Sequence, residues 1–220
     1  QLMCRRLFFL ACCCLALADA ALAELFPAPD DGGPLHFVVT AVTSGLNLRA
    51  RPSTGGDVVA TLQPGAILSN LGCTASDGRD WCYVQPFHGG AVGYVAADYL
   101  RPAISPNGAA IRGPDESALR AGRGDFDANG FIKCAQTPDG EMKECPFAVA
   151  RHGGGYATVV IERPDGMKRT IFFQMGIPLS ADTSEADGYH DFSARRQSDG
   201  YAIEVGPERY DIVDAIVLGG

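Results

Sequence analysis

The stretch Leu46-Asn-Leu-Arg-Ala-Arg-Pro-Ser-Thr54 decides how the first half of this chain is expected to fold. Like the other apolar segments of the sequence, it is short and is bounded by glycine, aspartate or proline, which is typical of β-strands. Neither half of the chain contains a convincing apolar repeat of about 3.6 residues, so we expect a mainly β protein. The apolar segments that follow the opening stretch are Val58–Leu62, Trp81–Val84, Gly93–Val95 and Asp98–Leu100.

In this combination and order, the segments resemble a bacterial SH3-type domain. The specific features are Leu-Asn-Leu-Arg at residues 46–49, the downstream Trp81, Gly-Tyr-Val at residues 93–95 and the closing Tyr99-Leu100. The resemblance covers residues 37–101. It implies a small, strongly bent antiparallel barrel of about five strands, with a long first loop from Arg49 to Asp57.

The resemblance also implies a binding function. In this family the domain is a binding or targeting module, often attached to exported proteins that act near the cell wall, and some members bind wall peptides. Arginine can pair with a peptide carboxylate, and aromatic rings offer flat apolar area. The alternative role for Trp81 and Tyr94 is to fill the interior of the barrel. The residues expected around a ligand groove are Asn47, Arg49, Trp81, Tyr94 and Tyr99.

Composition supports a folded protein and excludes one class of partner. The 220 residues are 46% hydrophobic and 20% charged, which is ordinary for two compact modules and excludes general disorder. Eighteen Lys and Arg against 26 Asp and Glu give a formal charge of −8. A phosphate backbone would mostly be repelled by this charge, so we expect no nucleic-acid partner.

The first 23 residues are typical of an export signal. Arg5 and Arg6 precede the apolar run Leu7–Leu17, and Ala21-Leu-Ala23 offers a cleavage site that would leave Glu24 first. A lipoprotein signal ending at Cys12 is the alternative, but its apolar region would be short. No other segment is long enough to span a membrane, so we expect a periplasmic or secreted protein without a transmembrane segment.

Cysteine placement agrees with export. Four of the eight cysteines fall within the signal, which leaves an even number in an oxidising compartment. Four cysteines allow three pairings, but each close pair brackets a turn, so the local disulfides Cys73–Cys82 and Cys134–Cys145 are favoured. A zinc site is disfavoured because the spacings are not of the CxxC type and the histidines are scattered.

The remaining sequence divides into a proline-rich leader at residues 24–36, a linker at residues 102–124 and an acidic module at residues 125–220. We expect the leader to be flexible and the linker to contain a short helical turn near Asp115–Ala121. The second module should have roughly seven strands in a small sandwich or barrel. It is expected to include a hairpin about Pro164–Gly166, a turn at Ser198–Gly200 and one long loop at Gly176–His190.

The second module resembles the tails of exported bacterial proteins that carry SH3-type domains, and this resemblance implies no activity. Its charge could attract a basic protein partner. The acidic residues considered for such a surface are Glu185, Asp187, Asp191, Asp211 and Asp214.

One motif in the second module suggests calcium. Asp125, Asp127 and Asn129 match the start of an EF-hand loop, but Gln136 stands where the bidentate carboxylate is required and Pro138 forbids the exit helix. We expect no tight metal site and no cofactor, and weak calcium binding stays open.

Catalytic patterns are weaker. The run His152-Gly-Gly-Gly155 resembles an oxyanion-hole stretch, but the chain has no nucleophile turn, so a flexible loop is expected. Serine, histidine and aspartate also occur together in one loop, and Cys134 could be combined with His152 or His190. We expect a non-enzymatic binding protein, with a wall-directed hydrolase of the second module as the alternative. The serine, histidine and aspartate residues of the loop mentioned above are Ser180, Ser184, His190 and Asp191.

Overall fold

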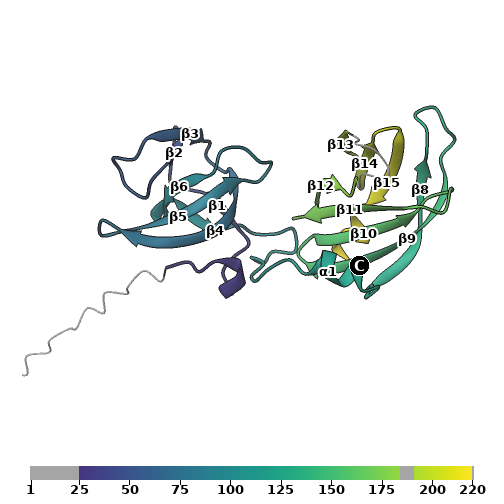
Figure 1. Cartoon of the computed structure of the whole chain (residues 1–220), viewed down its shortest axis with the longest axis horizontal. Helices are drawn as coiled ribbons and strands as arrows, with labels where there is room; N and C mark the ends of the chain where they lie inside the picture. Colours follow the sequence, from purple (N-terminus) through teal and green to yellow (C-terminus); the bar gives the residue numbers. More distant parts are fainter. Residues whose placement is uncertain (1–24, 184–190, 220) are drawn as a thin grey trace, which may run out of the picture.

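Two antiparallel β-sheets of seven and eight strands make up most of the protein (Figure 1). The computed structural model describes residues 25–183 and 191–219, so the expected signal peptide and the alternative lipoprotein cysteine lie outside the described residues. The fold is mainly β, as the sequence predicts. No helix within the described ranges is long and apolar enough to cross a membrane.

The first sheet has the strand order β3-β2-β6-β5-β4-β1-β7. It bends around a core that includes Phe37, Leu48, Leu68, Val84 and Val95. Because β1 and β7 extend it, the sheet has seven strands instead of the five or so that the family resemblance implies. The strands are β1 His36–Val39, β2 Leu46–Arg49, β3 Val58–Leu62, β4 Ile67–Ser76, β5 Arg79–Pro86, β6 Gly93–Ala96 and β7 Leu100–Pro102, with the 3-10 helix η2 at Ala97–Tyr99.

The β4–β5 hairpin carries the first disulfide. Asp77 and Gly78 form its two-residue tip, and both have positive φ angles, 52° and 72°. This geometry matches the right-handed twist of the strands, and Asp-Gly is among its preferred sequences. Cys73 and Cys82 are register partners on the two strands and are bonded to each other, which confirms the predicted local pair.

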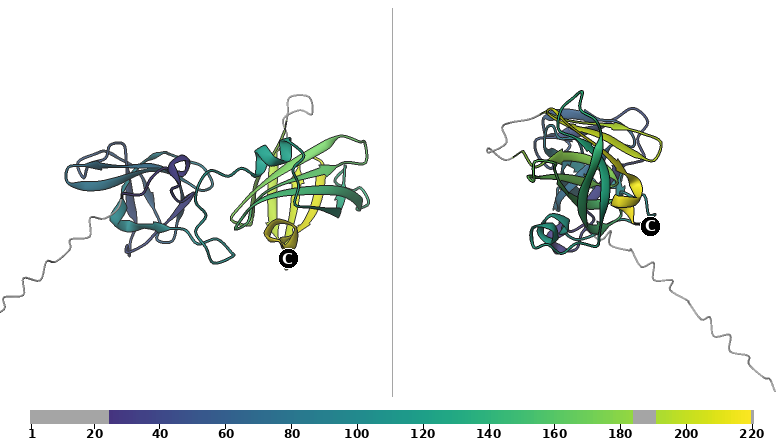
Figure 2. Two further views of the ribbon diagram at one scale, coloured as in Figure 1. Left: turned by 90° about the horizontal axis from the view of Figure 1, so that it is seen from below. Right: turned by 90° about the vertical axis from the view of Figure 1, so that its right-hand side faces the viewer.

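The second sheet has the order β12-β11-β10-β9-β8-β15-β14-β13 and curls until its edge strands approach each other, so that β12 lies close to β13 and β14. Of the two predicted alternatives, the structure therefore forms a nearly closed barrel (Figure 2). The second predicted disulfide, Cys134–Cys145, links β8 to β9. The strands are β8 Ala128–Ala135, β9 Lys143–Gly153, β10 Tyr156–Glu162, β11 Lys168–Gln174, β12 Ile177–Ala181, β13 Phe192–Arg196, β14 Gly200–Val205 and β15 Glu208–Val213.

The hairpin predicted about Pro164–Gly166 is confirmed, because β10 and β11 pair on either side of it. The turn at Ser198–Gly200 is confirmed between β13 and β14. The long loop expected at Gly176–His190 is wrong in its first part, which forms β12. Pro178 obscured this strand in the sequence, and it is tolerated there because β12 is an edge strand.

The leader and the linker are ordered against each other and against the first module. Within the leader, Pro29–Asp31 forms the 3-10 helix η1, and Pro34 forms a β-bridge with Arg112 of the linker. Asn70, from β4, donates hydrogen bonds to the carbonyl oxygens of Pro27 and Pro34 at 2.9 and 2.8 Å. The described part of the leader is thus hydrogen-bonded into the fold, whereas its composition suggests flexibility.

Two short helices contact the second barrel on different sides (Figure 2). The helix α1, at Ser117–Gly122, confirms the helical turn expected in the linker and lies against β9 and β10. Its Ser117 hydroxyl lies 2.9 Å from the hydroxyl of Thr158 on β10. The C-terminal helix α2, at Asp214–Leu218, buries Val217 in the core of the second barrel.

The two modules meet at a buried polar contact. His36 on β1 and Tyr156 on β10 are almost fully buried, and the His36 Nδ1 atom lies 2.6 Å from the Tyr156 hydroxyl. Burial lowers the pKa of His36 from 6.5 to about 4, because a charged imidazolium is poorly solvated there. A neutral histidine therefore joins the first strand of one sheet to the other module.

Candidate functional site

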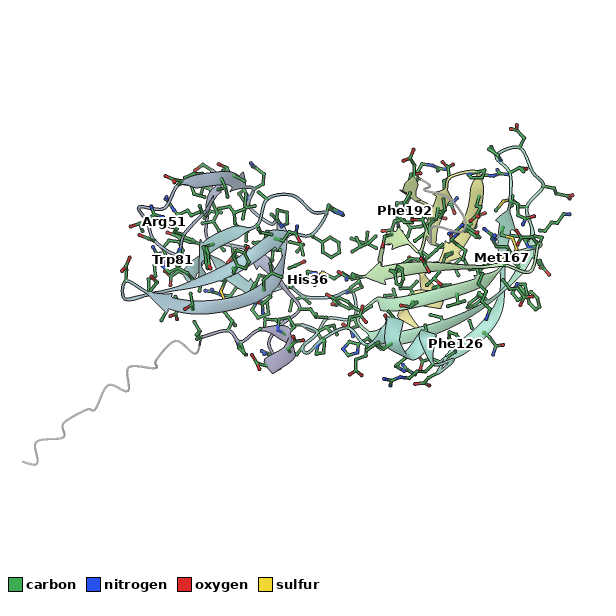
Figure 3. All side chains as sticks on the ribbon, viewed as in Figure 1. His36, Arg51, Trp81, Phe126, Met167 and Phe192 are labelled. Carbon is green, nitrogen blue, oxygen red and sulfur yellow. A yellow bond between two sulfur atoms is a disulfide. The ribbon has the colours of Figure 1, made fainter. Side chains whose placement is uncertain are left out.

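A pocket of about 410 Å³ opens on the first module. Its walls come from the segment 41–47, from β2 and β5, and from η2. Figure 3 shows Trp81 on the part of this module that faces away from the second module, whereas His36 lies at the junction. Four of the five residues expected around a groove line this pocket, namely Asn47, Arg49, Trp81 and Tyr99.

Tyr94, the fifth expected residue, does not line the pocket. It is the register partner of Arg49, but its ring packs against Tyr83 with ring centroids 4.9 Å apart. The ring is half-buried in this contact between β5 and β6. Tyr94 therefore lies outside both the pocket lining and the buried core cluster of the first module.

Arg49 stands at the end of β2, where the strand enters the long loop of residues 50–57. Its Nη1 atom donates a hydrogen bond to the carbonyl oxygen of Gly56 at 2.8 Å. The loop is closed at its base by the backbone hydrogen bond from Ala50 to Asp57. One edge of the guanidinium is therefore used to hold the loop, and the group has further N–H donors that can face a ligand.

Trp81 forms the inner wall of the pocket. Its side chain lies on β5 opposite Ala96 and is only 3% exposed. Among the described residues its Nε1–H is buried and has no hydrogen-bond partner. The residue is thus buried in the first module and also borders the pocket.

Arg79 is a pocket residue that sequence reasoning missed. Its side chain forms an ion pair with Asp98 at 2.6 Å, and its guanidinium lies 5.9 Å from the Trp81 ring centroid and 5.6 Å from that of Tyr99. The hydrogen bond to Asp98 raises the pKa of Arg79. The spacing of Arg79 and Trp81 on one strand was the available signal, because residues two apart share a face.

The outer wall of the pocket includes strained backbone. Ala41 has a φ angle of 58°, in the left-handed region that residues with a Cβ seldom adopt. Its neighbour Thr40 donates a backbone hydrogen bond to the carbonyl oxygen of Tyr99 at 2.8 Å, which fixes the start of the segment. Such strain persists only where the surrounding structure holds it, and it concentrates at binding sites.

The pocket is suited to an anion. Two arginines, Arg49 and Arg79, line it, and none of its lining residues is acidic. Asp98, which lies outside the lining, pairs with Arg79 and offsets one of these charges. Polar groups from Asn47 and Thr54 and the rings of Trp81 and Tyr99 complete a surface with one net positive charge and flat apolar area.

Comparison with known proteins places this pocket in a recognised type of domain. Residues 44–101 match the family described as the bacterial SH3 domain. The match spans β2 to β7 and therefore includes nearly the whole pocket, and domains of this family are typically binding modules. No curated protein matches the chain.

The second module uses its calcium-like motif for an ion-pair network. Arg120, from α1, pairs with Asp125 at 2.8 Å and with Asp127 at 2.9 Å. These hydrogen bonds lower the pKa of both carboxyl groups. Asn129 lies on β8, and within residues 25–183 and 191–219 no cluster of three potential metal-ligating residues occurs.

The glycine run after His152 forms a tight turn instead of a flexible loop. Gly154 and Gly155 join β9 to β10 with positive φ angles of 59° and 84°. A Cβ atom on Gly155 would lie 2.2 Å from the backbone nitrogen of Gly176, so the neighbouring hairpin also requires glycine there. Close packing between the β9–β10 turn and the β11–β12 turn therefore explains the glycine run that resembles an oxyanion-hole stretch.

The structure describes only some of the other catalytic candidates. Cys134 is bonded to Cys145, so it carries no free thiol to combine with His152. Ser180 lies on β12 and Asp191 immediately precedes β13. Ser184 and His190 lie outside the described residues.

Proposed function

We propose that the protein is an extracytoplasmic binding protein whose first module binds the carboxylate of a peptide or cell-wall component. The observation that carries the proposal is the pocket that combines Arg49 and Arg79 with Trp81 and Tyr99. An arginine fork suits a planar carboxylate, and the aromatic rings suit the apolar part of a peptide. The family match supports a binding role, and the two disulfides are consistent with an oxidising compartment.

The single tryptophan of the chain provides the test, because Trp81 borders the pocket. Tetraalanine with a free carboxylate is titrated into the protein while tryptophan fluorescence is followed, and tetraalanine amide serves as the uncharged comparison. The carboxylate form should bind more tightly. Arg49→Gln should weaken its binding by about 1.5–3 kcal/mol, the typical contribution of a charge-assisted hydrogen bond.

Arg101→Gln is the matched control, because Arg101 is an exposed arginine of the same module outside the pocket. It should bind like the parent. Tyr99→Ala should weaken binding without a large loss of stability, whereas Trp81→Ala should lower the free energy of unfolding by about 3–5 kcal/mol. If the acid and the amide bind equally, or if Arg49→Gln binds like Arg101→Gln, the assignment of the pocket to a carboxylate is wrong.

We infer that the protein acts by binding and not by catalysis. The disulfide at Cys134 and the hairpin turn at residues 153–155 support this inference, since both give structural roles to residues considered for chemistry. Incubation with purified cell-wall sacculi separates the alternatives. Co-sedimentation without release of soluble fragments agrees with a binding protein, and release of fragments would establish a hydrolase.

Fewer acidic side chains of the second module are available to a basic partner than the net charge of the module suggests. Asp214 is paired with Arg196, and Glu185 and Asp187 lie outside the described residues. Asp191 and Asp211 form no ion pair within the described part of the chain. We therefore propose the carboxylate pocket, and not the acidic surface, as the main binding site.

A further inference from the structure

The second module carries its own groove of about 570 Å³, between α1 and the outer face of the barrel. Val160 on β10 and Phe172 on β11 point outward and line it. Phe126, labelled in Figure 3, lines the groove from the segment that follows α1. The groove belongs to different elements from those of the carboxylate pocket, so its function is independent of the function proposed above.

The elements that form this groove are fixed in place. The contact between Ser117 and Thr158 holds the start of α1 on β10. At the other end of the helix, Arg120 pairs with Asp125 and Asp127 and also donates a hydrogen bond to the carbonyl oxygen of Arg151 at 2.7 Å. These contacts hold the helix against the sheet beside the groove.

The charges on the rim are unusual for this acidic module. Arg123 and Lys168 both line the groove and are exposed, and neither forms an ion pair in the described part of the chain. Most other arginines of the module are engaged, as in the pairs Arg163–Glu208 and Arg196–Asp214. Asp182 is the one acidic residue of the lining, so the rim carries one net positive charge.

We propose that this groove binds a small, free anionic amphiphile. The apolar body of the ligand lies on Val160, Phe172 and Phe126, and its carboxylate or phosphate lies near Lys168 and Arg123. The volume of about 570 Å³ is that of a site for one small molecule. A free ligand is favoured over a membrane surface because the apolar residues line a groove and do not project from the module as an exposed patch.

The test compares decanoate with decanol, which share an alkyl chain and differ in charge. Binding to the whole protein is followed by NMR chemical shifts of the backbone amides. Decanoate should bind more tightly and should shift the signals of Val160, Phe172 and Gly124. Lys168→Gln and Arg123→Gln should each weaken decanoate binding about tenfold and leave decanol binding unchanged.

Lys143→Gln is the matched control, because Lys143 is exposed and does not line this groove. It should bind decanoate like the parent. Equal affinity for decanoate and decanol, or no binding of either, would overturn the proposal. The proposal would also be overturned, in favour of a membrane lipid, if the protein floated with phosphatidylglycerol vesicles and Lys168→Gln abolished this flotation. The fluorescence of Trp81 reports the other pocket, so failure here is distinguishable from failure there.

Discussion

Arg49 in the first module and Arg169 in the second have opposite surroundings. In the first module, Arg49 and Arg79 face a surface pocket, and residues 37–101 hold equal numbers of basic and acidic groups, four of each. In the second module, Arg169 points into the barrel, where its side chain is 1% exposed, although residues 125–220 hold nine basic and sixteen acidic groups. Net charge alone therefore does not indicate where a charge is available for binding.

The buried guanidinium of Arg169 is paired with side chains from β15. Arg169 on β11 donates hydrogen bonds to both carboxylate oxygens of Glu208 on β15, at 2.7 and 2.8 Å. The Tyr210 hydroxyl donates to the same carboxylate at 2.6 Å, and Arg163 contacts it as well. Burial alone would raise the pKa of Glu208, but the hydrogen bonds from Arg169 and Tyr210, together with the positive charges of Arg169 and Arg163, outweigh burial and lower it.

The role of each of these two arginines depends on the partner that the fold places beside it. Arg169 has a carboxylate within the same barrel and serves structure. Arg49 is bonded only to a backbone carbonyl in the described structure and has further N–H donors for the anion proposed above. Removing the partner carboxylate Glu208 should therefore lower the stability of the second module. Removing a pocket arginine of the first module should instead weaken ligand binding and change stability little.

The largest expected effect is on the interior pair of the second module. Glu208→Ala leaves Arg169 buried without its carboxylate, and should lower the free energy of unfolding by about 3–5 kcal/mol. Urea denaturation followed by circular dichroism measures the change. Glu204→Ala, at an exposed position on the neighbouring β14, should change stability by no more than about 0.5 kcal/mol. Similar midpoints for the two variants would refute a structural role for the interior pair.

The next largest effect is expected at the junction between the modules, as a change of the free energy of unfolding with pH. Because burial lowers the pKa of His36 from 6.5 to about 4, the unfolded chain binds a proton in this range that the folded chain does not. Stability should therefore fall as pH decreases from 6.5 towards 4, by about 3 kcal/mol from this residue.

Unfolding free energies measured at several pH values test this expectation. The His36→Gln variant should lose this part of the pH dependence, whereas His88→Gln should retain it. A parent protein whose stability is constant over this range would show that His36 is not held neutral at the junction.

The smallest expected effect on stability is at the surface pocket of the first module. Arg79→Gln breaks an exposed ion pair with Asp98, so it should lower the free energy of unfolding by no more than about 1 kcal/mol. The same change removes one of the two pocket cations and should clearly weaken binding of tetraalanine carboxylate. Thermal melting and the fluorescence titration give the two readouts. A large loss of stability with unchanged binding would make Arg79 a structural residue like Arg169.

Much of the candidate binding site could be predicted because it lies on motif residues. Asn47, Arg49, Trp81 and Tyr99 belong to the segments that identify the SH3-type domain, and the structure brings them to one pocket. Arg79 was missed because its spacing from Trp81 indicates only that the two side chains share a face, and not that this face borders a pocket. Its position depends on the register of β5 and on Asp98, which approaches it from η2.

The mainly β class, the SH3-type segment and both disulfides could be predicted from the sequence, because alternation, turn residues and short cysteine spacings are local properties of a chain. The ordered leader, β12, the interior position of Arg169 and the groove beside α1 became evident only in the three-dimensional structure. Each of these depends on residues that are distant in sequence, such as Asn70 for the leader and Glu208 for Arg169. The energy of a buried polar group depends on the partner that folding brings to it, and local sequence does not specify that partner.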